Sequence, residues 1–331
     1  MADFTSHKQL EARFGAPPGI VLAKTIHQLD AGAKSWLAAS TIMIASIANG
    51  DDIDILLGGG AAGWAGGDNA TLRLPVDALD PPEPLVPGSA FGSIFMVPSL
   101  NELMRVNGRV IASEGSEVWV AVEECYIHCG KALIRSDFWS HTPDNHDRHA
   151  PERFAEHCRF IGLATCDPHS HADLSPKGDP AGLMVQLDHA SLRFADRPGN
   201  RRTDSFRNIV DQPRVAAALV VPGSFHLMIV RGTARITDDL AEREKFSVND
   251  KVPELVTVVT DISIDRRDSQ ALARANAWPA ASAPPGLNAG RIAAGHLKLS
   301  KGVGAKLAGL AMSVPGLVER EMARDYKKNL Y

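Results

Sequence analysis

Residues 97–108 read VPSLNELMRVNG, and residues 221–232 read VPGSFHLMIVRG. The two stretches align without a gap at an offset of 124 residues and share Val, Pro, Leu, Met, Val and Gly. A second pair, ASIANGDDIDILLGGGAAGW (residues 45–64) and ATCDPHSHADLSPKGDPAGL (residues 164–183), aligns at an offset of 119 residues. A repeat period of more than 100 residues predicts a duplicated domain rather than a solenoid. Self-complementary dimers are the commonest oligomers, so the two copies are expected to pair with each other. We therefore expect an intramolecular pseudo-dimer, with Ala45 opposite Ala164, Asp54 opposite Asp173, Gly59 opposite Gly178 and Gly63 opposite Gly182.

Composition narrows the class of protein. The 331 residues are 44% hydrophobic, which is enough for two cores of ordinary domain size. A net charge of −4 gives no reason to expect a nucleic-acid partner. No apolar run approaches the roughly 20 residues of a membrane span, and residues 1–20 lack a signal-peptide core. The four cysteines show no secreted disulfide spacing, so the sequence favours a cytoplasmic protein.

The two copies share one pattern of secondary structure. After a helical opening over residues 6–40, the chain changes at Thr41 to short β-rich runs separated by Gly, Pro, Asn or Asp. Six or so short strands per copy, with few helices, predict a mainly β fold of two tandem six-stranded antiparallel barrels. The predicted domains are barrel one over residues 1–139, a polar linker over 140–152, barrel two over 153–279 and a helical tail over 280–331.

The tail has its own pattern. Val318, Met322, Tyr326 and Leu330 recur every four residues, as in the apolar stripe of an amphipathic helix. Several basic residues precede it. We expect the stripe to dock onto the barrels, and closure of an active site is the alternative.

Copy two carries the strongest chemical signal, DLSPKGDPAG (residues 173–182) followed by RFADRPGNRRTDSFRNIV (residues 193–210). A strand ends near Ala195, Asn200 is placed to cap a following helix, and Pro213 ends that helix. A helix N-terminus with adjacent arginines is how proteins hold a phosphate dianion, although the arginines could instead solvate the helix end. The candidate ligand-binding residues of copy two are Ser175, Lys177, Arg197, Asn200, Arg201 and Arg202.

Copy one lacks these residues and carries a different set. It has Leu56, Leu57 and Gly58 where copy two has Ser175 to Lys177, and prolines within residues 81–87 exclude the equivalent helix. It has instead NELMRVNGRV (residues 101–110) and EECYIHCGKALIRSDFW (residues 123–139). At the end of the second segment, ALIRSDFW aligns with ALARANAW (residues 271–278), and copy two keeps Arg274 opposite Arg135 and Trp278 opposite Trp139.

The motifs RPGNRRTDSFRNI, SPKGDPAG, LMRVNGRV and YIHCGKALIRSDFW together resemble the pyridoxamine 5′-phosphate oxidase-like family of FMN-binding split barrels. The resemblance covers most of residues 8–279 and implies homodimers whose FMN lies at the interface and touches both subunits. In this chain the motifs are divided between the copies. The resemblance therefore implies one complete FMN site between the barrels and one lost site, hence one FMN per chain.

The resemblance also implies a role for each residue. The phosphate would be held by Arg197, Asn200, Arg201 and Arg202. Ser175 and Lys177 would lie beside the ribityl chain or flavin ring. His128 would be catalytic, donating a proton to the flavin or substrate. The alternative is that the segment around His128 begins a helix that only packs the barrels together, and the retained Arg274 and Trp278 favour this for Arg135 and Trp139. The expected contacts from copy one are His128, Lys131, Arg135, Arg105 and Asn107.

The expected function is an FMN-dependent oxidoreductase that acts on a small organic substrate, with oxygen, NADH or NADPH as electron partner. The basic residues of the tail favour an anionic substrate. The alternatives are a non-catalytic flavin- or haem-binding split barrel, and a flavin enzyme whose net reaction is not redox. No metal is expected, because Cys125, His128 and Cys129 lack a fourth ligand and the histidines of residues 141–152 lie in a connector. We expect a monomeric pseudo-dimer or a weak homo-oligomer.

Overall fold

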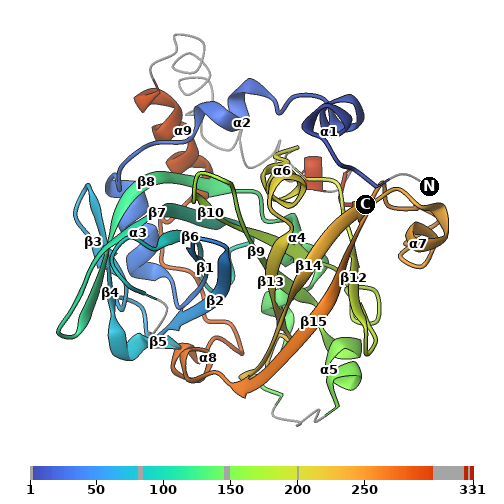
Figure 1. Ribbon diagram of the computed structural model, residues 1–331. Helices are drawn as coiled ribbons and strands as arrows, with labels where there is room; N and C mark the ends of the chain where they lie inside the picture. Colours follow the sequence, from blue (N-terminus) through green and yellow to red (C-terminus); the bar gives the residue numbers. More distant parts are fainter. Residues whose placement is uncertain (1–2, 81–84, 145–149, 200, 301–323, 327–328) are drawn as a thin grey trace.

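Two antiparallel sheets, one from each half of the chain, form the body of the molecule (Figure 1). The computed structural model describes residues 3–80, 85–144, 150–199, 201–300, 324–326 and 329–331. Within these residues the first sheet contains β1 Ile42–Asn49, β2 Asp52–Gly59, β3 Gly66–Gly67, β4 Thr71–Pro75, β5 Leu79–Asp80, β6 Ala90–Met96, β7 Leu103–Glu114 and β8 Glu117–His128. The second contains β9 Phe160–Cys166, β10 Ala172–Gly178, β11 Gln186–Leu187, β12 Ser191–Ala195, β13 Arg214–Val220, β14 His226–Thr237 and β15 Val256–Asp268.

The two sheets have the same strand order. The first runs β3-β4-β8-β7-β6-β1-β2-β5, and the second, taken from its other edge, runs β11-β12-β15-β14-β13-β9-β10. Only the two-residue strand β5 has no counterpart among the described residues. Apart from the two-residue strands, each sheet has six strands, so the predicted pair of six-stranded antiparallel barrels is confirmed.

Strand register corrects one detail of the internal alignment. On β6, Ser93 pairs with Ala45 of β1, and its counterpart Ala217, 124 residues later, pairs with Leu163 of β9. Leu163 is therefore the structural equivalent of Ala45, and the predicted pairing of Ala45 with Ala164 is wrong by one residue. Because side chains alternate along a strand, this slip matters: Ala45 and Leu163 lie in the cores of their barrels, whereas Ala164 lies between them. The cause is one extra residue in the β9–β10 hairpin: the paired residues Ala45 and Leu56 are 11 positions apart, whereas their counterparts Leu163 and Ser175 are 12 positions apart.

An apolar seam joins the barrels. A cluster of buried residues from both sheets, including Ile44 and Ile94 from the first and Phe160 and Leu174 from the second, lies between the two barrel cores. Phe138 packs at its centre, with its ring 5.1 Å from that of Phe160. Burial of this surface stabilises the two barrels against each other as well as individually.

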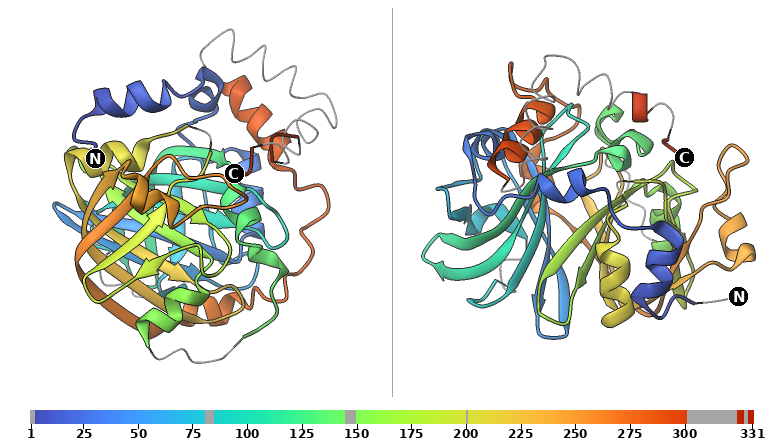
Figure 2. Two further views of the ribbon diagram at one scale, coloured as in Figure 1. Left: turned by 90° about the vertical axis from the view of Figure 1, so that its right-hand side faces the viewer. Right: turned by 90° about the horizontal axis from the view of Figure 1, so that it is seen from above.

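Helices cover the ends of the barrels, and two of them pack on the barrel that the other half of the chain forms. The helix α1 packs on barrel two, where Leu10 joins the core and Phe14 stacks 5.8 Å from Phe206. By contrast α9 packs on barrel one through Ile292 and Ala293, so α1 and α9 each cover the barrel made from the other half of the chain (Figure 2). The described helices are α1 His7–Phe14, α2 Gly19–Ala23, α3 Ala31–Ala39, α4 Lys131–Arg135, α5 Pro151–His157, α6 Asp204–Asp211, α7 Leu240–Glu244, α8 Gln270–Ala275 and α9 Ala289–Leu299, with 3₁₀ turns η1 Val76–Ala78 and η2 Phe138–Ser140.

The sequence predicted helices in the opening and in the tail of the chain. The helical opening predicted over residues 6–40 is divided into three short helices, α1, α2 and α3. In the tail, Val318 and Met322 lie outside the described residues, whereas Tyr326 and Leu330 are described. Within the described part of the chain, every helix is too short or too polar to span a membrane.

Candidate functional site

The seam repeats one contact on its two sides. On one side, Arg135 of α4 donates from Nε to the Gly178 carbonyl oxygen at 2.9 Å. On the other, Arg274 of α8 donates from Nε to the Gly59 carbonyl oxygen at 3.3 Å. Each glycine also lies against helix backbone: an added Cβ would lie 2.7 Å from the Ala132 carbonyl carbon at Gly178 and 2.8 Å from that of Ala271 at Gly59. The pairs Arg135/Arg274 and Gly59/Gly178, which were aligned from sequence, therefore hold the barrels together.

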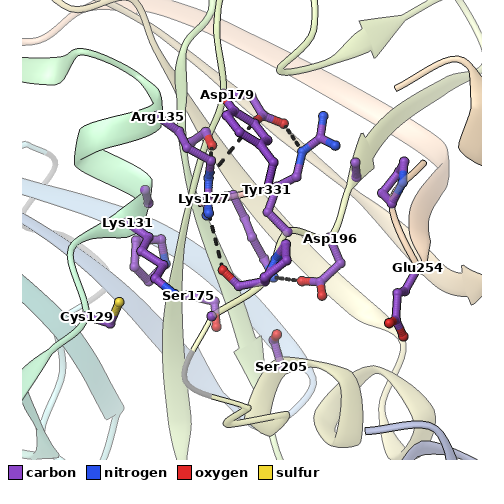
Figure 3. Close-up of a pocket in the computed structure, with 18 of the residues that line it drawn as sticks. Cys129, Lys131, Arg135, Ser175, Lys177, Asp179, Asp196, Ser205, Glu254 and Tyr331 are labelled. Atoms are coloured by element: carbon purple, nitrogen blue, oxygen red, sulfur yellow. Dashed lines mark hydrogen bonds and ion pairs between the residues drawn. The ribbon is translucent and has the colours of Figure 1, made fainter. Parts of the chain in front are cut away.

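A cavity of about 530 Å³ opens beside the Gly178 side of this seam (Figure 3). Both barrels contribute to its walls: barrel one through the end of β8 and α4, and barrel two through β10 and the connection from β12 to α6. Its volume is within the range of small-molecule and cofactor pockets. The predicted site residues that line it are His128, Lys131, Arg135, Ser175, Lys177, Arg197, Arg201 and Arg202.

Three predicted residues are not among those that line this cavity. Arg105 is buried and forms an ion pair with Asp173 across the seam. The Asn107 amide donates to Glu124 at 3.2 Å and faces a second cavity, of about 520 Å³. Asn200 lies outside the described residues.

The helix that follows β12 begins later than the sequence predicted. The helix α6 begins at Asp204, with Thr203 at its N-cap position, and ends at Asp211. Arg201 adopts φ 58°, in the left-handed region, which keeps residues 201–203 out of a right-handed helix. Backbone held in this region costs a non-glycine residue on the order of 1 kcal/mol and is often found at binding sites.

Carboxylates balance most of the cationic groups in the cavity. Asp179 accepts from Arg197 Nε at 2.6 Å, and Asp196 accepts from Lys177 Nζ at 3.1 Å. Arg202 donates to Asp204 at 2.8 Å. These pairs fix the positions of three cations before any ligand arrives.

Arg201 differs from its neighbours. It is exposed, and no ion pair or hydrogen bond of its side chain is found within the described residues. Its guanidinium therefore has donors available for an anionic ligand at the mouth of the cavity.

His128 is placed to accept a proton rather than to donate one. Its Nδ1 lies 2.9 Å from the Cys129 carbonyl oxygen, which orients the ring with Nδ1 as the donor. Burial lowers the pKa of His128 well below its usual value of 6.5, and the nearby Arg105 guanidinium adds to this effect. A neutral imidazole with Nδ1–H leaves Nε2 as an acceptor, in contrast to the proton donation expected from sequence.

Sequence reasoning missed a cationic cluster behind His128. Three cationic groups surround the buried Tyr126 ring: Arg202 at 4.4 Å, Arg105 at 5.6 Å and Lys24 Nζ at 5.9 Å from its centroid. Burial lowers the pKa of Lys24 to about 8. Lys24 precedes both barrels and belongs to none of the aligned motifs, so no sequence signal pointed to it.

The equivalent position in barrel one is filled by side chains. Gly58 stands where barrel two has Lys177, and an added Cβ there would lie 2.7 Å from the Trp64 ring and 2.9 Å from Met43. Trp64 packs on the barrel-one core, with its ring 6.2 Å from that of Phe95. The glycine at position 58 thus makes room for the indole.

Comparison with known families agrees with this geometry. Residues 148–278 match the model of a family described as pyridoxamine 5′-phosphate oxidase. The match spans the whole of barrel two. The match covers the β10 and β12–α6 segments that line the cavity, whereas the cavity residues of α4 come from the half of the chain outside the match.

Several solved structures resemble about a third of the chain. HupZ from Group A Streptococcus is 18% identical over 36% of this chain and 91% of its own, with a TM-score of 0.30. A protein described as F420 reductase is 19% identical over 36% of this chain and 98% of its own, with a TM-score of 0.28. General stress protein 26 from Bacillus anthracis is 18% identical over 35% and 90%, with a TM-score of 0.28. No curated protein matches the sequence.

Proposed function

We propose that this protein is an FMN-dependent oxidoreductase acting on a small organic substrate, with one FMN in the cavity between the barrels. The observation that carries the proposal is the asymmetry of the two equivalent positions. Lys177 lines a cavity built from both barrels, whereas its counterpart Gly58 lies against Trp64. A symmetric ancestor would hold two cofactors, and this arrangement leaves room for one.

The residues present fit an anionic cofactor that carries a ring system. The exposed Arg201 and the largely buried Arg202 lie just before α6, and the N-cap residue Thr203 and Ser205 of α6 also line the cavity. Guanidinium groups, hydroxyls and the first N–H groups of a helix are the donors that bind phosphate. Ser175 and Lys177, further inside, are suited to the ribityl chain or the polar edge of the flavin.

Bound FMN would supply hydride or electron transfer. The protein supplies charge, orientation and proton acceptance. Lys177, held by Asp196, places a positive charge inside the cavity, which favours anionic ligands. His128 offers Nε2 to a proton of the substrate or of the reduced cofactor, because its imidazole is neutral at pH 7.

The decisive experiment measures the cofactor itself. We expect the purified or FMN-reconstituted protein to show a flavin band near ~450 nm and one FMN per chain, bleached by NADH or NADPH in the absence of oxygen. Two FMN per chain would contradict the single site. A band near ~400 nm would instead indicate haem and a different function.

A further inference from the structure

The C-terminal residues supply part of the cavity wall. Tyr331 lines the cavity together with residues of both barrels (Figure 3). Its ring lies over the Arg197 guanidinium, 5.5 Å from ring centroid to Cζ. The sequence pattern predicted only that this tail docks on the barrels.

Asp325 organises the described part of the tail. Its Oδ2 lies 2.8 Å from Lys131 Nζ, and its Oδ1 accepts from the Asn329 amide at 2.8 Å. The Asp325 carbonyl oxygen also accepts from the Asn329 backbone N–H at 2.8 Å. The Lys131 side chain is only 4% exposed, so its charge requires a partner, and Asp325 provides it.

Two further contacts fix the end of the tail to opposite walls. Arg135 of barrel one donates to the Leu330 carbonyl oxygen at 2.9 Å. Lys251 of barrel two donates to the Tyr331 carbonyl oxygen at 2.9 Å. Lys131 and Arg135, expected from sequence to touch the cofactor, therefore hold the tail, and the tail carries an aromatic ring into the cavity wall.

We propose that Tyr331 is a ligand-contacting residue of this cavity and that the Asp325–Lys131 ion pair positions it there. The inference rests on the proposed function in that FMN, an anionic ligand with an aromatic ring, is the ligand. About 530 Å³ remains open with the tail in place, so the tail forms a wall around the ligand space rather than filling it. The phenol ring offers an aromatic face for a planar group of the ligand.

The test measures FMN release from the full chain by stopped-flow fluorescence. We expect Asp325→Asn and Lys131→Gln each to raise the release rate about tenfold, and the double variant to add little to either, because both remove one interaction. Tyr331→Leu should raise the rate similarly, and Tyr331→Phe, which retains the ring, should remain near the wild type. Asp52→Asn is the matched control, since the Asp52 side chain is 92% exposed and is not among the cavity residues.

Hydrogen exchange of residues 324–331 separates this inference from the proposed function. We expect FMN to slow exchange in the wild type, and Asp325→Asn to speed it with or without FMN. Unchanged release from both Asp325→Asn and Tyr331→Leu would overturn the inference while leaving FMN binding intact, and so would tighter FMN binding by Asp325→Asn. If the wild type binds no FMN, the proposed function fails, and exchange protection that Asp325→Asn removes would still support Asp325 as the residue that positions the tail.

Discussion

The paired glycines of the seam allow one perturbation to be made twice, once beside the cavity and once away from it. Gly178→Ala would place a Cβ 2.7 Å from the Ala132 carbonyl carbon, and Gly59→Ala would place one 2.8 Å from that of Ala271. Carbon atoms pack at about 3.5–4.0 Å, and the carbonyl oxygens of Ala132 and Ala271 lie closer still, so in each variant a helix backbone must move by at least about 1 Å. Overpacking of this kind costs about 1–3 kcal/mol.

Both variants should therefore lose similar stability. With about 2–4 °C of Tm per kcal/mol for a protein of this size, we expect each to lower the Tm by about 2–12 °C. Only Gly178 and Ala132 line the cavity, so only Gly178→Ala should also weaken FMN binding, by about tenfold for each 1.4 kcal/mol of lost contact.

The assay combines thermal unfolding of the flavin-free protein with titration by FMN fluorescence. Similar losses of Tm with weakened binding in Gly178→Ala alone would support the placement of the site. If Gly59→Ala weakens binding as much, or if Gly178→Ala binds FMN as the wild type does, then this cavity is not the FMN site.

Three other predictions use single residues. Arg201→Ala should raise the Kd for FMN about 10- to 100-fold, because a hydrogen bond to a charged group contributes about 1.5–3 kcal/mol. Equilibrium titration measures this Kd, with the exposed Arg214→Ala as the control. An unchanged Kd in Arg201→Ala would show that the phosphate lies elsewhere. Trp64→Ala should cost about 3 kcal/mol in urea unfolding yet leave one FMN per chain, because room alone does not restore the missing cations; a second bound FMN would refute this. Since burial depresses the pKa of His128 below 6.5, the unfolded chain binds more protons, so this contribution to stability is full above about pH 6.5 and is lost as pH falls below it. His128→Asn should flatten the fall in unfolding free energy between about pH 7 and pH 5, and an equally steep fall in the variant would contradict the assignment.

The fold was predictable because both copies retain turn and strand signals, and the ungapped motif from Val97 to Gly108 keeps its strand register in copy two. The one-residue error in the alignment of Ala45 was not predictable. Ala45 of β1 and Ala164 of β9 lie on opposite faces of the equivalent strands, so an alignment that is wrong by one residue still pairs alanine with alanine. Most of the site was predictable for a similar reason: the motifs were recognisable, and duplication brings their halves together across a seam.

The remaining residues depend on contacts between distant segments. Arg105 of barrel one forms an ion pair with Asp173 of barrel two. In the same way, Arg231 of barrel two forms an ion pair with Asp54 of barrel one, with 2.5 Å between Nη2 and Oδ1. The two aspartates are aligned in sequence, but their arginine partners are not: at the offset of 124 residues Arg105 aligns with Ile229, two positions before Arg231. The alignment therefore did not reveal that the two ion pairs are equivalent. Lys24 and Asp325 lie outside both repeats, and no local pattern marks a residue whose partner is more than 100 positions away.

The crossing of α1 onto barrel two has a consequence for how the chain is made. Leu10 and Val259 share one core, but Val259 is synthesised about 250 residues after Leu10. At about 5–20 residues per second, the helix waits roughly 12–50 s for the surface that buries it. During translation the apolar side chains of α1, Leu10 and Phe14, are therefore exposed to chaperones and proteases, and we expect folding of the nascent chain to finish only when α1 meets the completed barrel two.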